Sequence, residues 1–319
     1  MGVVRIEADP SGVLPGRFWD AFSLFEEAGR AYDGNDFAKA ESLYARIPAE
    51  FADSDLVAPA TFNRGLALER LQRPAEAEAL YESLLAGHPG AVHADEVVFR
   101  IGACQEARGN WDAAARTYGV RARALALAPL REAEAEVRRG VALYHLARGD
   151  EAIDALRGGL ASFRKLRLNP VRVPEDVIGE GYFTLGEIYR GRSEAVSLDV
   201  PEDRQARALD SRSELLLLAR AQYTQAIRSY TATWMTAALC RIGEGYEAFW
   251  SAAMAAPLPD GLTLAETTEY KKKMEKEMAP VLHNAVAAHR RNVNLSTELG
   301  ISNAWTQTSR LKLQSLPAE

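Results

Sequence analysis

Apolar residues recur at helical spacing through most of the 319-residue chain, with charged residues between them. Between Glu214 and Tyr230, for example, Leu218, Ala226 and Tyr230 lie on or near one face of a helix. Further helices are expected over residues 234–253 and 264–299, with a turn at 257–261 between them. The pattern therefore predicts an all-α fold.

A spacing pattern repeats four times in the first half of the chain. A small residue is followed after twelve residues by alanine, and after four more by tyrosine or leucine. The four sets are Ala28, Ala40 and Tyr44; Gly65, Ala77 and Tyr81; Gly102, Ala114 and Tyr118; and Gly140, Ala152 and Leu156. Successive sets begin 37, 37 and 38 residues apart, which indicates structural repeats.

Each set predicts a hairpin of two helices, because a Gly- or Asn-containing turn such as Gly34-Asn35 or Gly109-Asn110 separates its two halves. A glycine inside a helix costs about 1 kcal/mol relative to alanine. Close approach of a second helix is the reason we expect for that cost. The tyrosines and Leu156 are expected to fill the gap to the next hairpin.

These repeats resemble the tetratricopeptide repeat (TPR) family. The third set carries most of the match, at Phe99, Ile101, Gly102, Gly109, Trp111, Ala114 and Tyr118. The match covers about residues 20–165, and the longer spacing implies longer hairpins or linkers than the family's 34-residue unit. The resemblance implies a right-handed superhelical solenoid of antiparallel helix pairs.

The rest of the chain carries looser versions of the pattern around Gly186 and Gly243. We expect about six repeats and a C-terminal capping region. The expected parts are an extended arm over 1–16, four repeats over 17–165, two degenerate repeats over 166–255 with an insertion at about 191–212, and a long helix with a cap over 256–319.

The last long helix is expected to begin at a capping box formed by Thr263 and Glu266. Pro280 predicts a kink or a break in this helix. Trp305 and Leu311 are expected to fold back as a cap, since a repeat array must cover its last apolar face.

The last 90 or so residues also resemble TPR proteins of the bacterial cell envelope, especially those of the myxobacterial gliding-motility apparatus. The matching positions are Trp234, Ile242, Gly243, Tyr246, Glu247, Pro257, Pro259, Tyr270, Pro280, Ala285 and Trp305. This resemblance implies a scaffold in an envelope assembly. The first residues lack a secretory signal pattern. Two compartments therefore stay open, the periplasm for a mature chain without its signal and otherwise the cytoplasm.

Composition narrows the function classes. The chain has 38 basic and 44 acidic residues and a net charge of −6, which argues against a dedicated nucleic-acid binder. No apolar run reaches the roughly 18 residues of a membrane span. The two cysteines lie in helical stretches and are expected to be buried thiols.

No catalytic motif is present. The sequence contains neither a Walker-type phosphate loop nor a GxSxG nucleophile turn. His283 and His289 are six residues apart, so they are expected on different helix faces, solvated or partly buried, rather than as a metal pair. His88 and His93 flank a turn and carry no metal prediction. We therefore expect no enzyme, metal or cofactor.

A binding face follows from the TPR resemblance, because the first helices of TPR hairpins line a concave groove. Residues two and three positions before the packing glycines form a row of polar donors and a row of phenylalanines. The predicted partner-binding residues are Phe62, Asn63, Phe99, Arg100, Arg138, Tyr144, Phe183 and Arg241. A groove of this kind suits a peptide or partner helix with acidic and aromatic residues.

Other interpretations of these residues stay open. Glu96 and Glu134 precede Arg100 and Arg138 by four residues and could neutralise them. The phenylalanines could be buried between repeats. Asn63 and Arg100 also match two positions of the clamp with which some TPR domains bind chaperone tails. The other basic and amide positions of that clamp are occupied here by Phe25, Gly29 and Glu96, so we do not expect the chain to bind a chaperone tail.

The leading hypothesis is a non-enzymatic scaffold within a larger assembly. The alternatives are a regulatory receptor for a short peptide and an enzyme whose site has no sequence motif.

Overall fold

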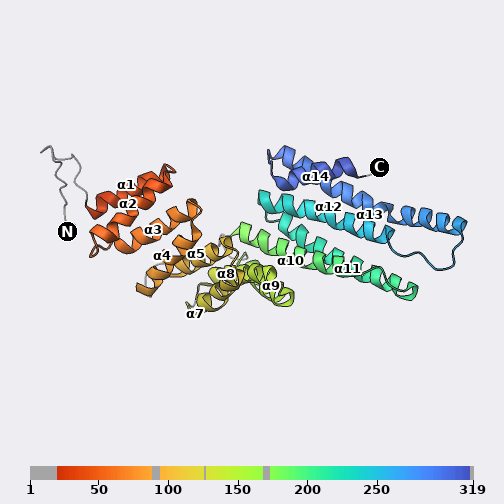
Figure 1. Cartoon of the computed structure of the whole chain (residues 1–319), viewed down its shortest axis with the longest axis horizontal. Coiled ribbons are helices and arrows are strands. Elements are labelled where there is room, and N and C mark those ends of the chain that lie inside the picture. The colour runs from red at the N-terminus through yellow and green to blue at the C-terminus, as the bar shows by residue number, and fades with distance from the viewer. Residues whose placement is uncertain (1–19, 88–93, 126, 168–172, 317–319) are drawn as a thin grey trace. The chain divides into compact units, whose positions relative to one another are not determined.

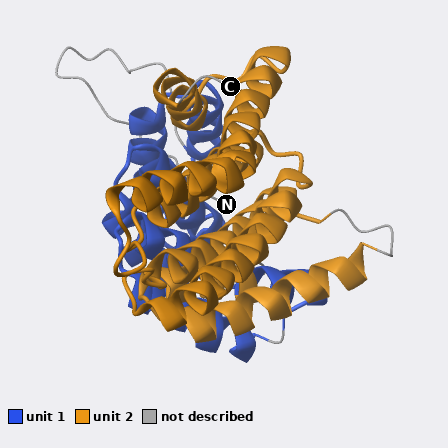
Figure 2. Cartoon of the chain, turned by 90° about the vertical axis from the view of Figure 1, so that its right-hand side faces the viewer, with its two compact units in different colours: residues 1–135 blue, residues 136–319 orange. Residues whose placement is uncertain are grey.

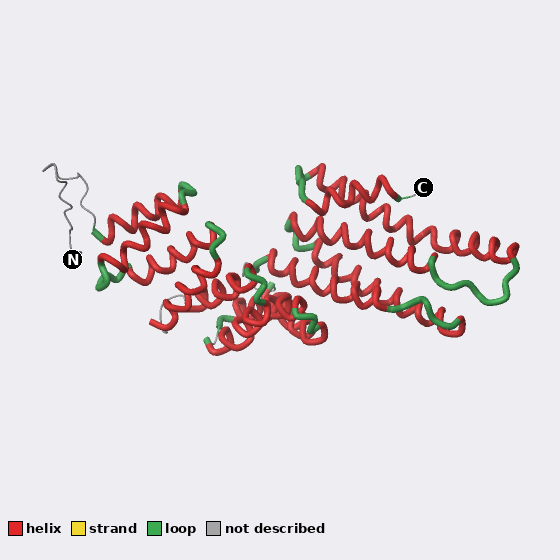
Figure 3. Tube along the Cα trace, viewed as in Figure 1, coloured by secondary structure: helices red, strands yellow, loops and turns green. Residues whose placement is uncertain are grey.

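A computed structural model of the chain describes residues 20–87, 94–125, 127–167 and 173–316. The arm expected at 1–16 lies outside these residues. Every element of the described chain is helical, and Figure 3 shows only helices joined by loops. The all-α prediction is confirmed.

The chain divides into two compact units, residues 1–135 and residues 136–319, and the division falls inside α8 (Pro129–His145). Figure 2 colours the two units. Before α8, unit 1 contains α1 (Ala21–Asp33), α2 (Phe37–Glu50), α3 (Val57–Arg70), α4 (Pro74–Gly87), α5 (Ala94–Ala107), α6 (Trp111–Arg116), a π-helical turn η1 (Thr117–Arg121) and α7 (Ala122–Ala124). After α8, unit 2 contains α9 (Gly149–Leu166), α10 (Glu175–Ala195), α11 (Glu202–Ile227), α12 (Ala232–Met254), α13 (Leu264–Glu298) and α14 (Ala304–Ser315).

Consecutive helices pack as hairpins, as Figure 1 shows for α1 with α2, α3 with α4, α10 with α11 and α12 with α13. Side-chain caps fix where several helices begin. Asp20 accepts a hydrogen bond from the backbone N–H of Ser23 at 2.7 Å, and Asp36 accepts one from Lys39 at 3.1 Å. Asn35, in the predicted turn between α1 and α2, has a φ of +62°. Asparagine tolerates this left-handed conformation better than most residues.

The packing glycines lie where the sequence predicts, inside first helices and against a second helix. A Cβ atom on Gly65 would lie 2.5 Å from the Tyr81 ring, and one on Gly140 would lie 2.6 Å from Leu156. Both contacts join the two helices of one hairpin. Tyr81 also lies in one buried cluster with Val97 and Ile101 of α5, so the expectation that it fills the gap to the next hairpin is confirmed. The same expectation for Leu156 stays a prediction.

The later hairpins show the same contact between a glycine of the first helix and a side chain of the second helix. A Cβ on Gly186 would collide with the Tyr223 ring, and one on Gly243 would collide with the imidazole of His289. The later hairpins are longer than the early ones. Residues of the expected insertion at 191–212 extend both α10 and α11, and only 196–201 lie between these two helices.

The structure of the C-terminal part agrees with some of the predictions made from its sequence and differs from others. Thr263 and Glu266 form the predicted capping box at the start of α13. This helix continues through Pro280 without a break. Trp305 lies half-buried on α14, but Leu311 is 65% exposed. The expectation that Leu311 helps to cap the array is therefore wrong, because it lies on the solvent side of its helix.

Candidate functional site

Four of the predicted binding residues lie on first helices of unit 1. Phe62 and Asn63 belong to α3, and Phe99 and Arg100 belong to α5. Phe62 is half-buried, with its ring centroid 5.7 Å from that of the tyrosine in its own hairpin. Phe99 is buried beneath Arg131, whose guanidinium carbon lies 4.6 Å from the ring centroid. Phe62 is therefore partly accessible, whereas Phe99 is covered.

Arg100 links two hairpins. It donates from Nε to Glu96 at 3.0 Å, and from Nη1 to Glu69 of the preceding hairpin at 3.2 Å. Burial alone would lower the pKa of Arg100, but the charges of Glu69 and Glu96 outweigh it and raise that pKa. The sequence predicts the pairing with Glu96 but not the pairing with Glu69. The side chain of Arg100 stays 37% exposed.

Tyrosine hydroxyls hold the neighbouring polar groups of this face. Tyr81 donates to Glu69 at 2.6 Å, and Asn63 donates from its amide to the hydroxyl of Tyr44 at 3.2 Å. Burial raises the pKa of Tyr81, and the hydrogen bond to Glu69 raises it further. The two polar residues of this row, Asn63 and Arg100, are therefore each held by a side chain of the preceding hairpin.

The other four predicted residues lie in unit 2. Arg138 on α8 pairs with Glu180 on α10 at 3.7 Å. Tyr144, also on α8, is half-buried, and its pKa is raised first by burial and then by the negative charge of Glu187.

Phe183 and Arg241 meet around Trp305. The ring centroid of Phe183 on α10 lies 6.0 Å from that of Trp305 on α14, in an edge-on arrangement. The guanidinium carbon of Arg241 on α12 lies 4.9 Å from the indole centroid. Two predicted binding residues are thus brought together from different helices to hold one aromatic side chain, a contact that the sequence did not predict.

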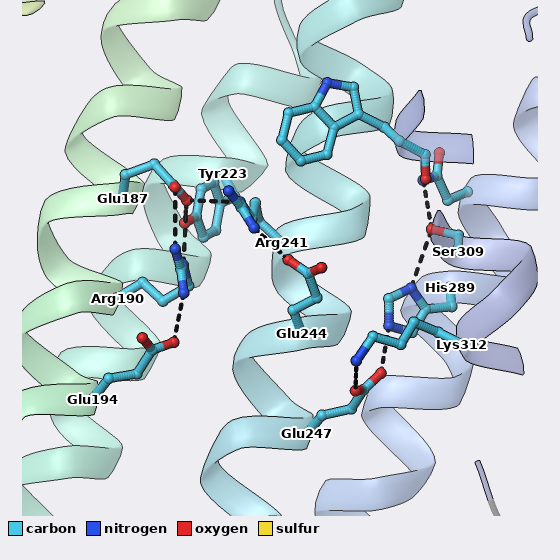
Figure 4. A network of polar contacts seen from close by, with 12 residues as sticks. Glu187, Arg190, Glu194, Tyr223, Arg241, Glu244, Glu247, His289, Ser309 and Lys312 are labelled. Atoms are coloured by element: carbon cyan, nitrogen blue, oxygen red, sulfur yellow. Dashed lines mark hydrogen bonds and ion pairs between the residues drawn. The ribbon is translucent and has the colours of Figure 1, made fainter. Parts of the chain in front are cut away.

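A chain of ion pairs lies beside this aromatic contact (Figure 4). Glu187 accepts hydrogen bonds from the hydroxyl of Tyr223 and from Arg190, the latter at 3.1 Å, and it forms an ion pair with Arg241 at 3.3 Å. Arg241 also pairs with Glu244 at 2.6 Å. Burial would lower the pKa of Arg190, but its contacts with Glu187 raise it. Glu187 is therefore a buried carboxylate whose charge is offset by two guanidinium groups.

A second polar cluster joins α12, α13 and α14. His289 lies 2.8 Å from Glu247 through Nε2 and 3.1 Å from Ser309 Oγ through Nδ1. Lys312 donates to the second oxygen of Glu247 at 2.6 Å, and Asn292 donates to Ser309 at 2.8 Å. Since an ionised carboxylate only accepts, Nε2 carries the proton toward Glu247, and a neutral imidazole can accept from Ser309.

The order serine, histidine and glutamate is that of a hydrolase triad, but the site is closed. His289 and Ser309 have no exposed surface, and the imidazole packs on Gly243. The ring is also reversed, because the serine of a hydrolase triad meets Nε2. A substrate has no path to Ser309 in this arrangement. We interpret the cluster as polar packing that fixes α14.

His289 departs from its predicted environment. The sequence predicts a solvated or partly buried side chain, whereas His289 takes the position that tyrosine occupies in the earlier hairpins. His283 is exposed. In the early repeats sixteen residues separate the glycine from its tyrosine, whereas the long α12 and α13 place His289 much further from Gly243. A search at fixed spacing therefore could not find it.

Other reactive groups are buried or scattered. Burial raises the pKa of the Cys104 thiol to about 12 and that of Cys240 to about 11. Within residues 20–87, 94–125, 127–167 and 173–316, no group of three His, Cys, Asp or Glu side chains could hold a metal ion. No helix in these ranges is long and apolar enough to cross a membrane.

Comparisons with known proteins find similarity among solved structures. No family model matches the chain, and no curated protein matches it. Among solved structures, it is similar to a tetratricopeptide repeat protein from Parabacteroides merdae ATCC 43184, with a TM-score of 0.45 and 15% identity, over 92% of this chain and 97% of that chain. The resemblance to gliding-motility proteins stays a prediction.

Proposed function

We propose that the chain is a non-enzymatic scaffold that holds a segment of a partner protein against the first helices of its hairpins. The contact between α14 and the rest of unit 2 carries this proposal. Phe183 and Arg241, two residues of the predicted face, hold the indole of Trp305. A face that binds an aromatic side chain of its own chain has the chemistry to bind one from another protein.

Unit 1 repeats this arrangement in the same register. In each unit, a phenylalanine lies three residues before one packing glycine, and an arginine lies two residues before the glycine of the next hairpin. A glutamate bridges to that arginine at 3.2 Å in unit 1 and at 3.3 Å in unit 2. The residues that correspond in register are Phe62 and Phe183, and Arg100 and Arg241, whereas Glu69 stands four residues after its glycine and Glu187 one.

This correspondence suggests the chemistry of the partner. An aromatic residue would pack on Phe62 beside the guanidinium of Arg100, and an acceptor would take the amide N–H of Asn63. Acidic residues beside the aromatic one would reach the exposed part of Arg100. Because these side chains already have fixed partners, ordering them on binding costs little entropy.

A displayed library of random peptides, selected on the whole chain, tests the proposal. We expect enriched sequences to contain an aromatic residue with flanking carboxylates. The best peptide, measured by calorimetry, should lose at least about tenfold in affinity, or about 1.4 kcal/mol, in Arg100→Gln and in Phe62→Leu.

Arg64→Gln is the matched control. Arg64 lies on α3, is 30% exposed and pairs with Glu41 of the preceding hairpin at 2.7 Å, but it stands outside the predicted row. Its affinity should match that of the unchanged chain. Equal binding by all three variants, or a library without enrichment, would contradict the proposal.

A further inference from the structure

Two hollows of opposite charge lie on the surface, one on each unit. The acidic hollow, of about 500 Å³, is formed by the start of α1 and the loop between α2 and α3. Its rim carries Asp20, Asp53 and Asp55. The neighbouring Glu50 pairs with Arg46 at 2.7 Å, so the charge of the rim comes mainly from the three aspartates.

An exposed aromatic residue stands in the acidic hollow. Phe22 on α1 is 63% exposed, although it lies on the first helix of the described chain. An exposed phenylalanine beside a hollow is typical of a contact surface.

The basic hollow, of about 610 Å³, lies beside the turn between α11 and α12 and the C-terminal half of α13. Its lining is mainly apolar and includes Met235 and Leu295. Its charged lining residues are Arg290, Arg291 and Glu298, which give the lining a net charge of +1. This hollow therefore combines an apolar floor with a positively charged rim.

Tyr230 stands at the edge of the basic hollow and is 83% exposed. Its φ is +56°. The other described non-glycine residues with positive φ also lie in helix turns, and they are Asn35, Gln72 and Ala147. A bulky aromatic residue in this conformation costs about 1 kcal/mol or more in backbone strain. The exposed ring of Tyr230 makes little contact within the chain that could offset this cost. An external contact would account for a tyrosine here.

We propose that the acidic hollow of one copy of this chain docks on the basic hollow of a second copy, head to tail. Asp53 and Asp55 would face Arg290 and Arg291, and Phe22 would pack on the apolar floor near Leu295. In such a pair one copy keeps its basic hollow and the other keeps its acidic hollow, so the contact is heterologous and builds open chains or a closed ring. Neither hollow contains a residue of the proposed partner-binding face.

Sedimentation velocity on the whole chain tests this assembly. The weight-average mass should rise above the monomer mass of 34.9 kDa with concentration at low salt, and it should fall toward that mass at high salt. The double variants Asp53→Lys with Asp55→Lys and Arg290→Glu with Arg291→Glu should each weaken self-association at least tenfold. Circular dichroism checks that both are folded.

Mixing the two double variants gives the decisive result. Their mixture should associate again. The native acidic hollow of the arginine variant can dock on the native basic hollow of the aspartate variant, and the two hollows with reversed charge are complementary to each other. The control is the double variant Arg204→Glu with Arg207→Glu, at exposed positions on α11. It changes the net charge by the same amount as Arg290→Glu with Arg291→Glu and should leave association unchanged.

Three outcomes would overturn the proposal. The chain could stay monomeric at every concentration, as it would if residues 1–19 covered Phe22. Association could persist in both double variants, which would assign it to another surface. The mixture of variants could also fail to associate.

Discussion

At Gly140 the missing side chain lets Leu156 lie directly on the helix backbone. A Cβ there would come within 2.6 Å of Leu156 Cγ and 3.0 Å of its backbone nitrogen. Two effects therefore oppose each other at this position. Alanine favours a helix by about 1 kcal/mol over glycine, but overpacking of a close contact costs about 1–3 kcal/mol.

We expect Gly140→Ala to destabilise the chain by about 1–2 kcal/mol, because overpacking exceeds the gain in helix propensity. Gly158 lies on the second helix of the same hairpin, and a Cβ added there would meet nothing within 4 Å, so Gly158→Ala should stabilise by up to about 1 kcal/mol. Urea unfolding measures both. The same sign for both substitutions would contradict the packing role of Gly140.

Glu247 gives the cluster under α14 a dependence on pH. Burial would raise the pKa of Glu247, but hydrogen bonds from His289 and Lys312 outweigh it and hold that pKa below its ordinary value of 4.5. The stabilisation from this carboxylate is therefore present above about pH 4.5. It is lost as the pH falls through the lower pKa of the folded chain.

Glu247→Gln should be less stable than the unchanged chain by about 1–3 kcal/mol at pH 7. This difference should shrink as the pH falls below 4.5, because the glutamate becomes neutral as well. Unfolding curves at pH 7, 5 and 3 measure the difference. A constant difference across this range would show that the charge of Glu247 contributes nothing.

Sequence reasoning at the residue scale succeeds where spacing is fixed locally. Gly65 and Tyr81 are identifiable as packing residues because the short turn between their helices sets their separation. The packing of Tyr81 on Gly65 of its own hairpin is not predicted, because spacing does not encode the direction of a side chain. The contact between Phe183 and Trp305 is not predicted either, since it joins helices that are far apart in the chain.

Among the elements, α14 depends on side-chain contacts to stay docked. Trp305 packs against Phe183 and Arg241, Ser309 meets His289, and Lys312 reaches Glu247. These contacts face α10, α12 and α13, whereas Leu311 on the same helix is exposed.

We expect Trp305→Ala to increase amide hydrogen exchange in residues 304–315 at least about tenfold, because the loss of the indole contacts with Phe183 and Arg241 costs more than about 1.4 kcal/mol of local stability. Leu311→Ala is the matched control on the same helix and should leave exchange there unchanged. Mass spectrometry of the exchanged peptides measures both. Equal protection in both variants would mean that α14 is held without Trp305.

Some elements can be predicted from the sequence and others cannot. The capping box at Thr263 is predictable from two residues, because such a motif is local. The π-helical turn η1 is not, since Tyr81 lies at the same spacing from its glycine in a regular α-helix. The insertion at about 191–212 is predicted because the repeat pattern is lost there. In the structure most of these residues belong to the ends of α10 and α11. The pattern is lost there because exposed, polar helix turns have no apolar stripe.

At the scale of the whole molecule, each hairpin touches mainly its neighbours along the chain. The stability of such an array is approximately a sum of repeat and nearest-neighbour contributions. The apolar cluster around Leu24 and Ile47 belongs to unit 1, and the one around Leu216 and Phe249 belongs to unit 2.

Gly243→Ala should therefore act locally. The added Cβ would collide with His289, so exchange should rise in α12, α13 and α14, while α1 to α4 keep their protection. Gly191→Ala on α10, where the added Cβ meets nothing within 4 Å, is the control. Loss of protection throughout the chain would show that the array unfolds as one cooperative body.

The two cysteines provide a built-in reporter of these local openings. Cys104 lies on α5 in unit 1 and Cys240 on α12 in unit 2, and both thiols are buried and protonated at neutral pH. A thiol reagent such as a disulfide dye should therefore react with each only when its own helix opens. The two reaction rates, resolved by mass spectrometry, would measure the opening of the two units separately within one unmodified chain.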